Sequence, residues 1–148
     1  MSDTYGKNEL IINGDYSEKI VPYIDLAKIS IDILMYDWRW YKQDFSCDVS
    51  LVNSALVRAV RRGVKVRAVV NTNTVIEQLN ALGIVAKGWK KSKAMHAKCF
   101  ILDHTAVMIG SHNLTQNAMG FNVEISAIFS DVQIADELTK YFNSLWLL

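Results

Sequence analysis

Short apolar runs that alternate with runs of helical period constrain the fold of this chain more than any other sequence feature. Strands are predicted at residues 8–13, 29–36, 64–70, 84–87, 97–102, 106–109 and 122–129. Helices are predicted to follow Ser17, to span residues 49–62, to end near Leu82 and to begin at Asp131. The alternation predicts an α/β fold with a mixed β-sheet flanked by helices, in which the closely spaced strands of residues 97–129 are antiparallel neighbours. The length of 148 residues predicts a single domain, residues 1–148.

Five residues of types that commonly begin or end helices define the predicted helix ends. Ser17, Asp48 and Asp131 carry side chains that commonly accept hydrogen bonds from the first free N–H groups of a helix, so each is predicted to be an N-cap. Gly63 and Gly83 follow runs of helical period and are predicted to end them, because glycine adopts a positive φ at low cost.

The composition restricts where the chain works and what it contacts. It contains no window of about 18 consecutive apolar residues, so no membrane-spanning helix is expected and a membrane partner is disfavoured. Residues 1–9 are polar and lack the apolar run of a secretion signal, which favours an intracellular, cytoplasmic protein. Cys47 and Cys99 are too few for a disulfide scaffold, and reduced thiols are expected.

One stretch of the sequence carries side chains suited to phosphate chemistry. Alternate residues of a strand point to one face, so His96 and Lys98 are predicted to share a face and Cys99 to point the other way, into the core. An imidazole can attack phosphorus or transfer protons while a nearby ammonium neutralises phosphate oxygens. Ser111 and Asn113 follow the next strand and can donate hydrogen bonds to an oxyanion.

The order of these residues resembles the signature of the phospholipase D superfamily, which reads H-x-K, four residues, D, six residues and then G-S-x-N. His96, Lys98 and Asp103 stand at that spacing, and residues 110–113, Gly-Ser-His-Asn, complete it. The resemblance implies the α/β sandwich of that superfamily and a phosphodiester substrate.

The chain contains one such motif, whereas most members of the superfamily contain two. It is therefore similar to the small single-motif endonucleases of the superfamily, which form one active site from two protomers, and the resemblance implies a homodimer with an isologous interface. By this resemblance, His96 of one subunit attacks phosphorus to form a phosphohistidine, and His96 of the partner subunit protonates the leaving oxygen. Lys98 and Asn113 of both subunits hold the phosphate and Ser111 assists. No metal ion or cofactor is expected, because the paired lysines and asparagines offset the anionic charge.

Two acids have separate expected roles. Glu124 is the candidate for the downstream acid that orients the catalytic histidine in the superfamily. On an otherwise apolar strand it shares a face with Asn122 and Ser126, and a buried carboxylate there needs a partner. Asp103 completes the motif among the candidate catalytic residues, but its place at a strand end predicts a structural role.

The remaining histidines leave an alternative to weigh. His112 occupies the variable position of the motif and is a candidate substrate contact, whereas His104 is expected to face solvent in a turn. A zinc site built from His96, Cys99, His104 and His112 is disfavoured, because Cys99 faces away from His96 and no spacing typical of zinc ligands is present.

The loop of residues 36–45 is rich in aromatic side chains, which have three possible uses. They pack against the core or a second subunit, stack on the bases of a single strand, or enter a lipid interface. Arg39 and Lys42 lie between them, which favours nucleic acid, and Trp38 and Arg39 are the candidate substrate contacts. The aromatic residues are Tyr36, Trp38, Trp40, Tyr41 and Phe45.

The formal net charge of +1 conceals a strongly basic middle segment. Residues 58–98 contain ten Lys and Arg residues and a single acid, Glu77, whereas the flanks are net acidic. The total charge therefore does not argue against a polyanionic substrate. Contact with a phosphate backbone is predicted for the cluster just before the motif. This cluster comprises Trp89, Lys90, Lys91 and Lys93.

Three functions fit these observations. The leading hypothesis is a metal-independent endonuclease that cleaves DNA or RNA with little sequence preference. The same chemistry serves a phospholipase D or phosphatidyltransferase that acts on lipid head groups, because both kinds of substrate are phosphodiesters. The third hypothesis is a catalytically silent nucleic-acid-binding dimer that uses the motif only to hold phosphate.

Overall fold

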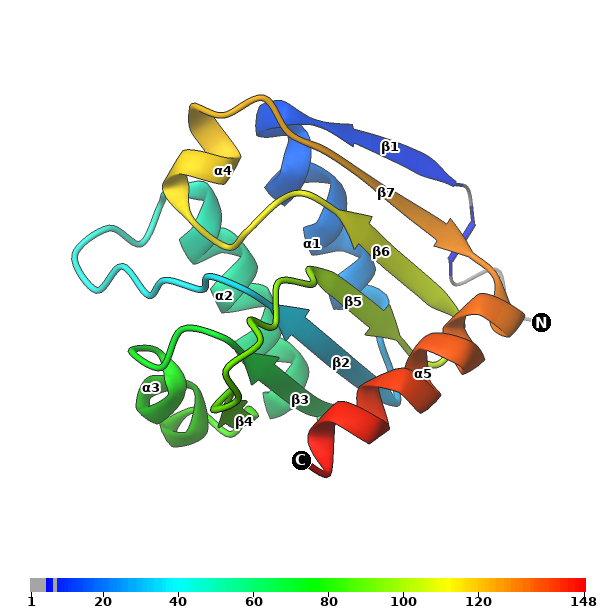
Figure 1. The fold of residues 1–148 in the computed structure, drawn as a ribbon. Helices are drawn as coiled ribbons and strands as arrows, with labels where there is room; N and C mark the ends of the chain where they lie inside the picture. Colours follow the sequence, from blue (N-terminus) through cyan, green and yellow to red (C-terminus); the bar gives the residue numbers. More distant parts are fainter. Residues whose placement is uncertain (1–4, 7) are drawn as a thin grey trace.

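The computed structural model describes residues 5–6 and 8–148, whose central element is a β-sheet with helices on both faces (Figure 1). The strands are β1 Glu9–Ile12, β2 Ser30–Met35, β3 Lys65–Val70, β4 Val85–Gly88, β5 Cys99–Leu102, β6 Ala106–Gly110 and β7 Ile125–Ser130. The helices are α1 Tyr16–Leu26, α2 Asp48–Arg61, α3 Ile76–Ala81, α4 Gln116–Gly120 and α5 Val132–Trp146, and a 3-10 helix, η1 Asn13–Asp15, precedes α1.

The sheet has the strand order β1-β7-β6-β5-β2-β3-β4, with β5 at its centre. On one side of β5, strands β2, β3 and β4 are parallel to one another. On the other side, β6, β7 and β1 are antiparallel neighbours, and β5 is antiparallel to both β2 and β6. The predicted mixed sheet and the predicted antiparallel pairing within residues 97–129 are confirmed.

Two predicted strands begin later than the sequence pattern indicated, and the difference affects the motif. β5 begins at Cys99 rather than at residue 97, and β7 begins at Ile125 rather than at residue 122. Just before β7, the backbone of Glu124 pairs with Asn13, whose Oδ1 accepts a hydrogen bond from Glu124 N at 2.9 Å. The Asn13 side chain thus accepts the hydrogen bond that a neighbouring strand would otherwise accept from Glu124 N. Glu124 therefore lies just outside β7, at the edge of the sheet.

Two of the three predicted N-caps, Ser17 and Asp48, are wrong. Ser17 lies inside α1, and its Oγ donates to Asp48 Oδ1 at 2.8 Å, so it joins α1 to α2 instead of capping. Asp48 is the first residue of α2, and Cys47 occupies the N-cap position. The predicted cap of the last helix is confirmed, because Asp131 Oδ1 accepts a hydrogen bond from Ile134 N at 3.0 Å.

Both predicted glycine stops are confirmed. Gly63 has a φ of 97° after α2, and Gly83 has a φ of 92° after α3, a region that other residues adopt only with strain. A Cβ at Gly83 would also meet the side chain of Val60, so this turn requires glycine on two grounds. These turns return the chain to β3 and β4 and so align the parallel half of the sheet.

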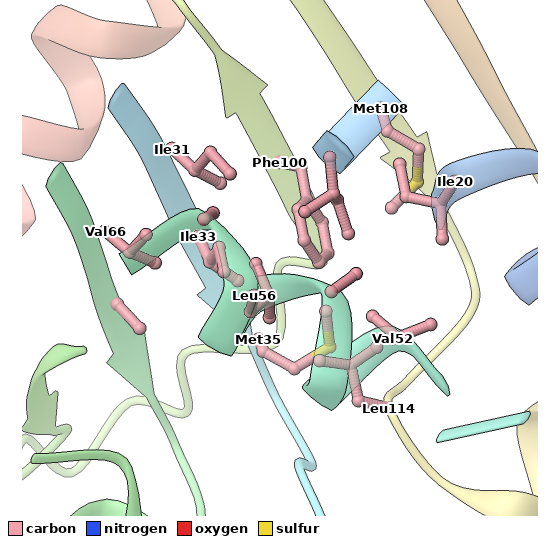
Figure 2. Packing of buried hydrophobic residues seen from close by; sticks show 14 of the residues in the cluster. Ile20, Ile31, Ile33, Met35, Val52, Leu56, Val66, Phe100, Met108 and Leu114 are labelled. Carbon is pink, nitrogen blue, oxygen red and sulfur yellow. The ribbon is translucent and has the colours of Figure 1, made fainter. Parts of the chain in front are cut away.

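Two hydrophobic layers hold the sheet. The larger layer lies between the sheet and helices α1 and α2, and the smaller one lies under α5, which crosses the other face (Figure 1). Cys99 belongs to the layer under α5, in agreement with its predicted place in the core. Figure 2 shows the larger layer, where the labelled residues are Ile20, Ile31, Ile33, Met35, Val52, Leu56, Val66, Phe100, Met108 and Leu114.

Among the residues that the structure describes, no helix combines the length and the apolar character needed to cross a membrane. The polar start of the chain, interpreted above as unlike a secretion signal, falls largely on residues 1–4 and 7, which lie outside the described residues.

Candidate active site

Five of the six candidate catalytic residues gather at one edge of the sheet, where β2, β3 and β6 end and where β5 and β7 begin (Figure 1). His96 and Lys98 precede β5, Ser111 and Asn113 follow β6, and Glu124 precedes β7. Because neighbouring antiparallel strands begin and end at a common edge, a motif spread over 29 positions converges on one place.

His96 and Lys98 lie on the same side of the chain, as predicted. Lys98 Nζ lies 3.0 Å from His96 Nδ1 and donates to the His96 carbonyl oxygen at 2.9 Å. An ammonium group only donates, so Nδ1 accepts and a neutral ring carries its proton on Nε2. Partial burial lowers the pKa of Lys98, and the nearby Glu124 carboxylate acts in the opposite direction.

Tyr36, named above only as a member of the aromatic loop, is a part of this site. Its ring centroid lies 4.4 Å from that of His96, and Lys98 Nζ lies 5.5 Å from the Tyr36 ring. The available signal was its position, one residue after β2, at the edge where the motif also lies. Tyr36 supports one face of the imidazole and restricts how the ring can turn.

Glu124 is almost buried, but within the described residues its carboxylate does not contact His96. It accepts a hydrogen bond from Ser111 Oγ on one oxygen and from Asn122 Nδ2, at 3.0 Å, on the other. Within one protomer, Ser111 and Asn122 thus hold Glu124, and its expected role in orienting the catalytic histidine of the two-subunit site stays a prediction. The strand order separates the two residues of one protomer: β6 lies between β7 and β5, so Ser111, which follows β6, stands between Glu124 and His96.

Asn113 is held in one orientation by the segment that follows β2. Its Oδ1 accepts a hydrogen bond from the backbone N–H of Asp37 at 3.1 Å. Because a backbone N–H only donates, this contact identifies the oxygen and leaves the amide nitrogen as the group that can donate to an anion. The predicted role of Asn113 as a phosphate ligand is compatible with this orientation.

His112 is fully buried, so its predicted contact with substrate is wrong. The Nε2 nitrogen lies 2.8 Å from the carbonyl oxygen of Asn13 and therefore donates, while Nδ1 accepts from Ser126 Oγ at 2.7 Å. Burial lowers the pKa of this ring and keeps it neutral. His112 thus anchors the segment that presents Ser111 and Asn113, its two neighbours in the chain.

Asp103 lies at the opposite end of β5 from His96, in a turn with a φ of 53°. Its carboxylate accepts hydrogen bonds from three consecutive backbone N–H groups, those of residues 28–30, at 2.7–3.1 Å. It also accepts one from Tyr5 Oη at 2.9 Å. These contacts agree with the predicted structural role and place Asp103 away from the other candidate catalytic residues.

The aromatic loop divides into buried and open parts. Trp38 is fully buried and its Nε1 donates to Asn53 Oδ1 at 2.9 Å, so its predicted contact with substrate is wrong. Arg39 is exposed and forms a two-pronged ion pair with Asp37, with a shortest distance of 2.8 Å. Phe45 is 81% exposed. The buried indole of Trp38 has its hydrogen-bond acceptor on α2. The sequence around Trp38 does not reveal this distant partner.

The lysines before the motif are open to solvent, whereas the tryptophan among them is not. Lys90, Lys91 and Lys93 are exposed. Trp89 packs partly against the layer under α5, and its Nε1 donates to the Lys93 carbonyl oxygen at 2.6 Å. Trp89 therefore shapes the turn that carries the lysines, and the lysines are the groups free to meet a phosphate.

The basic middle segment does not form one continuous face. Arg58 pairs with Asp25 at 3.0 Å, and Arg67 pairs with Asp32 at 2.8 Å. Arg62 donates to backbone carbonyl oxygens at the end of α1. These arginines stabilise the helices and the sheet, whereas the exposed lysines before His96 are positive charges that lie next to the motif.

His104 is exposed in the turn before β6, as predicted. Its Nε2 lies 3.2 Å from Ser30 Oγ, at the end of the sheet opposite to the site. In the described part of the chain, no group of three or more His, Cys, Asp or Glu side chains is placed to share a metal ion.

A family model described as "Cardiolipin synthase, PLD-like domain" matches residues 20–146, which include every motif residue. The chain belongs to the PLD-like domain family. The H-x-K and G-S-x-N residues gathered at the sheet edge all lie within the matched range.

Individual relatives agree with this membership. The PLD-like domain is 30% identical over 110 residues to a mitochondrial cardiolipin hydrolase of Xenopus laevis, covering 68% of this chain and 52% of that protein. It is 25% identical over 151 residues to a probable phospholipase D of Caenorhabditis elegans, covering 92% of this chain and 27% of that protein. The chain thus spans about half or less of the length of these relatives.

Among solved structures, a phospholipase D family member, Nuc from Salmonella typhimurium, has the same fold. It superimposes with a TM-score of 0.79 and 24% identity, covering 95% of each chain. The PLD-like domain and Nuc therefore share one architecture over their whole lengths.

Proposed function

We propose that this chain is a metal-independent phosphodiesterase that works as a homodimer and hydrolyses DNA or RNA with little sequence preference, through a phosphohistidine intermediate. The observation that carries the proposal is the gathering of His96, Lys98 and Asn113 at one sheet edge. His96 is exposed there, and its Nε2 has no hydrogen-bond partner among the described residues.

The first step uses His96 as the nucleophile. Attack through Nε2 requires a lone pair on that nitrogen, so the ring proton must move to Nδ1, which accepts from Lys98 in the free protein. An anionic phosphodiester attracts Lys98 Nζ and frees Nδ1. Nε2 then bonds to phosphorus as the bond from phosphorus to the leaving oxygen breaks, and His96 of the partner subunit donates a proton to that oxygen.

The second step restores the enzyme. A water molecule bonds to phosphorus as the P–Nε2 bond breaks, and its proton passes to the partner subunit's His96, which thereby regains its acid form. Lys98 and Asn113 donate to the phosphate oxygens in both steps, and Ser111 assists. Positive charge and fixed donors aimed at these oxygens stabilise the transition state.

An exposed apolar face beside the site supports the homodimer. The register pairs Ile12 with Ile125, and Ser111 N donates to the Ile125 carbonyl oxygen at 3.0 Å, so the face begins at the catalytic edge. Proteins that work as monomers rarely expose contiguous apolar patches, and a twofold axis beside the site would bring two copies of His96 together. The exposed apolar residues are Leu10, Ile12, Ile109, Phe121, Val123 and Ile125.

Nucleic acid is the proposed substrate because the exposed Lys90, Lys91 and Lys93 lead directly into the motif. A row of exposed lysines beside a phosphodiester site attracts a polyanion along its length, whereas a lipid offers one head group. The resemblance to single-motif endonucleases supports the same choice. The cytoplasmic location expected from the sequence stays a prediction.

A phospholipid phosphodiesterase is the second candidate, and the names of some relatives favour it. The 30% identical relative is a cardiolipin hydrolase, and cardiolipin is a phosphodiester of a lipid. Phe45, exposed on the loop beside the site, is the kind of side chain that enters a lipid interface.

A cleavage panel with EDTA present separates these functions. The purified protein is incubated with single-stranded DNA, double-stranded DNA, RNA, and vesicles that contain cardiolipin and phosphatidylcholine, with His96→Ala as the matched inactive variant. We expect cleavage of nucleic acid by the wild type only. Hydrolysis of lipid without cleavage of nucleic acid would establish the second candidate, and binding of DNA without turnover on any substrate would establish a silent binding dimer.

Subunit mixing tests the shared site. Wild-type and His96→Ala chains are mixed in varied ratio, unfolded together and refolded at constant total concentration. If each site needs both histidines, activity per total protein follows the square of the wild-type fraction. A linear dependence would show that each protomer works alone and would overturn the proposed dimeric mechanism.

A further inference from the structure

Two adjoining hollows lie along the aromatic loop where it leaves the catalytic edge, and the proposed reaction does not use them. The first, about 300 Å³, is lined by Asp37, Arg39, Tyr41 and residues 115–117. The second, about 530 Å³, lies between the loop and α3 and shares Arg39 and Tyr41 with the first. The two hollows adjoin at these shared residues and are together called the groove.

The groove starts at the catalytic asparagine. Asp37 N donates to Asn113 Oδ1 at 3.1 Å, and the next residue but one, Arg39, donates from its N–H to the Leu114 carbonyl oxygen at 3.0 Å. The loop thus runs beside the G-S-x-N segment before it reaches Tyr41. Tyr41 lies four positions after Asp37, a span of at most about 14 Å. A chain bound at Asn113 reaches the groove with its neighbouring unit.

Two aromatic side chains form rigid walls of the groove. Trp40 and Tyr41 are half-buried and pack against the main core, while both also line the second hollow. Tyr41 Oη accepts a hydrogen bond from Gln116 N at 3.0 Å, which holds its ring in place. Planar rings fixed from behind can receive another planar ring without losing further conformational entropy.

Apart from Val75 and Ala81, the other groups that line the groove are polar. Arg39 and Lys42 supply positive charge, Asp37 and Glu77 supply negative charge, and Gln78 and Thr74 supply donors and acceptors of hydrogen bonds. Aromatic surfaces among cations and amides are the features with which proteins bind single-stranded nucleic acid, where each base presents a flat face. An acyl chain in the same place would cover these polar groups without pairing them, at a cost in free energy.

We propose that this groove is a nucleotide subsite, in which a base next to the scissile phosphate of single-stranded DNA or RNA stacks on Trp40. The inference rests on the proposed nuclease function and adds a strand preference to it. Bases of a duplex are stacked on one another and are not available to Trp40, so single strands are the preferred substrate. The exposed Lys42 holds an adjoining phosphate.

The test separates the groove from the catalytic residues by using substrates with and without a base. Trp40→Leu keeps an apolar side chain against the core but removes the aromatic plane, and Trp40→Phe restores a smaller plane. Tyr141→Ala, an exposed aromatic on α5, is the matched control for loss of a surface ring. Bis(4-nitrophenyl) phosphate and an oligonucleotide of abasic residues carry the phosphodiester without nucleobases.

On single-stranded DNA, we expect Trp40→Leu to lower kcat/KM by about tenfold, while Trp40→Phe loses less and Tyr141→Ala loses nothing. On bis(4-nitrophenyl) phosphate and on the abasic oligonucleotide, Trp40→Leu should equal the wild type. An equal loss on all substrates would show a structural role and would overturn the subsite, as would no loss on single-stranded DNA. A loss confined to cardiolipin vesicles would make the occupant a lipid.

Cleavage by the wild-type protein shows which of the two proposals fails, the nuclease function or the nucleotide subsite. If the wild type cleaves no nucleic acid, the proposed function itself fails and the subsite fails with it. If the wild type cleaves single-stranded DNA and Trp40→Leu cleaves it equally well, the function stands and only the subsite is overturned.

Discussion

The two ends of β5 carry two parts of one motif, and their surroundings differ. At the start of the strand, His96 is exposed, and in the described part of the chain its ring nitrogens meet one hydrogen-bonding group, Lys98 Nζ. At the other end, the Asp103 carboxylate accepts from three backbone N–H groups and from Tyr5. A group that must form a new bond keeps hydrogen-bonding capacity unused, whereas a group that holds the chain together uses all of it. Motif membership alone therefore does not reveal which residues react.

Replacement of His96 should give the largest effect on turnover and almost none on stability. His96→Ala removes the nucleophile, so kcat should fall by at least about 10³-fold, while an exposed side chain changes the free energy of unfolding by no more than about 0.5 kcal/mol. Turnover of bis(4-nitrophenyl) phosphate and urea denaturation measure the two quantities. His104→Ala, an exposed histidine at the other end of the sheet, is the control and should retain full activity. Retained activity in His96→Ala would show that the exposed start of β5 does not supply the nucleophile.

Replacement of Asp103 should show the reverse pattern. Asp103→Ala leaves the N–H groups of residues 28–30 and the Tyr5 hydroxyl without their acceptor, so the free energy of unfolding should fall by about 2–4 kcal/mol. Activity per folded molecule should not change. Asp103→Asn keeps one acceptor oxygen and tolerates the φ of 53°, so it should lose less. Urea denaturation with an active-site titration gives both values, and a folded but inactive Asp103→Ala protein would show that this end also takes part in the chemistry.

The smallest effect concerns His112, a structural anchor at the catalytic end. Burial depresses its pKa below the ordinary value of 6.5, so below about pH 6.5 the unfolded chain binds more protons than the folded one. The free energy of unfolding should therefore decrease as the pH falls through that value, and the decrease should stop below the folded-state pKa.

His112→Gln keeps a donor and an acceptor but does not titrate, so it isolates this contribution. The difference in unfolding free energy between wild type and His112→Gln, measured by urea denaturation from about pH 8 to about pH 5, should shrink toward the acid side. The exposed histidines are present in both proteins and cancel. A difference that is independent of pH would mean that His112 is not the buried neutral ring described here.

Much of the fold could be predicted because periodicity and turn residues are local. The runs of Ile, Leu and Val predicted the strands, and Gly63 and Gly83 predicted helix ends that the structure confirms. Ser17 and Asp48 were each predicted to cap their own helix, yet they hydrogen bond to each other. That contact depends on how α1 packs against α2, which neither segment encodes by itself.

In the site, motif spacing predicted the residues that converge but not the contacts among them. Glu124 was expected to contact the catalytic histidine, and within one protomer the strand order places Ser111 between them. His112 and Trp38 were expected at the surface because polar and aromatic residues near a motif often bind substrate. Both are buried, because each meets a partner from a distant segment, Asn13 for His112 and Asn53 for Trp38.

The pairing of β1 with β7 determines when the site is assembled. The first strand of the sheet pairs with the last, and Asn13 contacts Glu124 across 111 positions of the chain. Closing so long a loop slows folding, because its entropy must be lost before the contacts compensate for it. During synthesis, the anchors of Ser111 and Glu124 form only after β7 has left the ribosome. This catalytic edge is therefore among the last parts of the molecule to form.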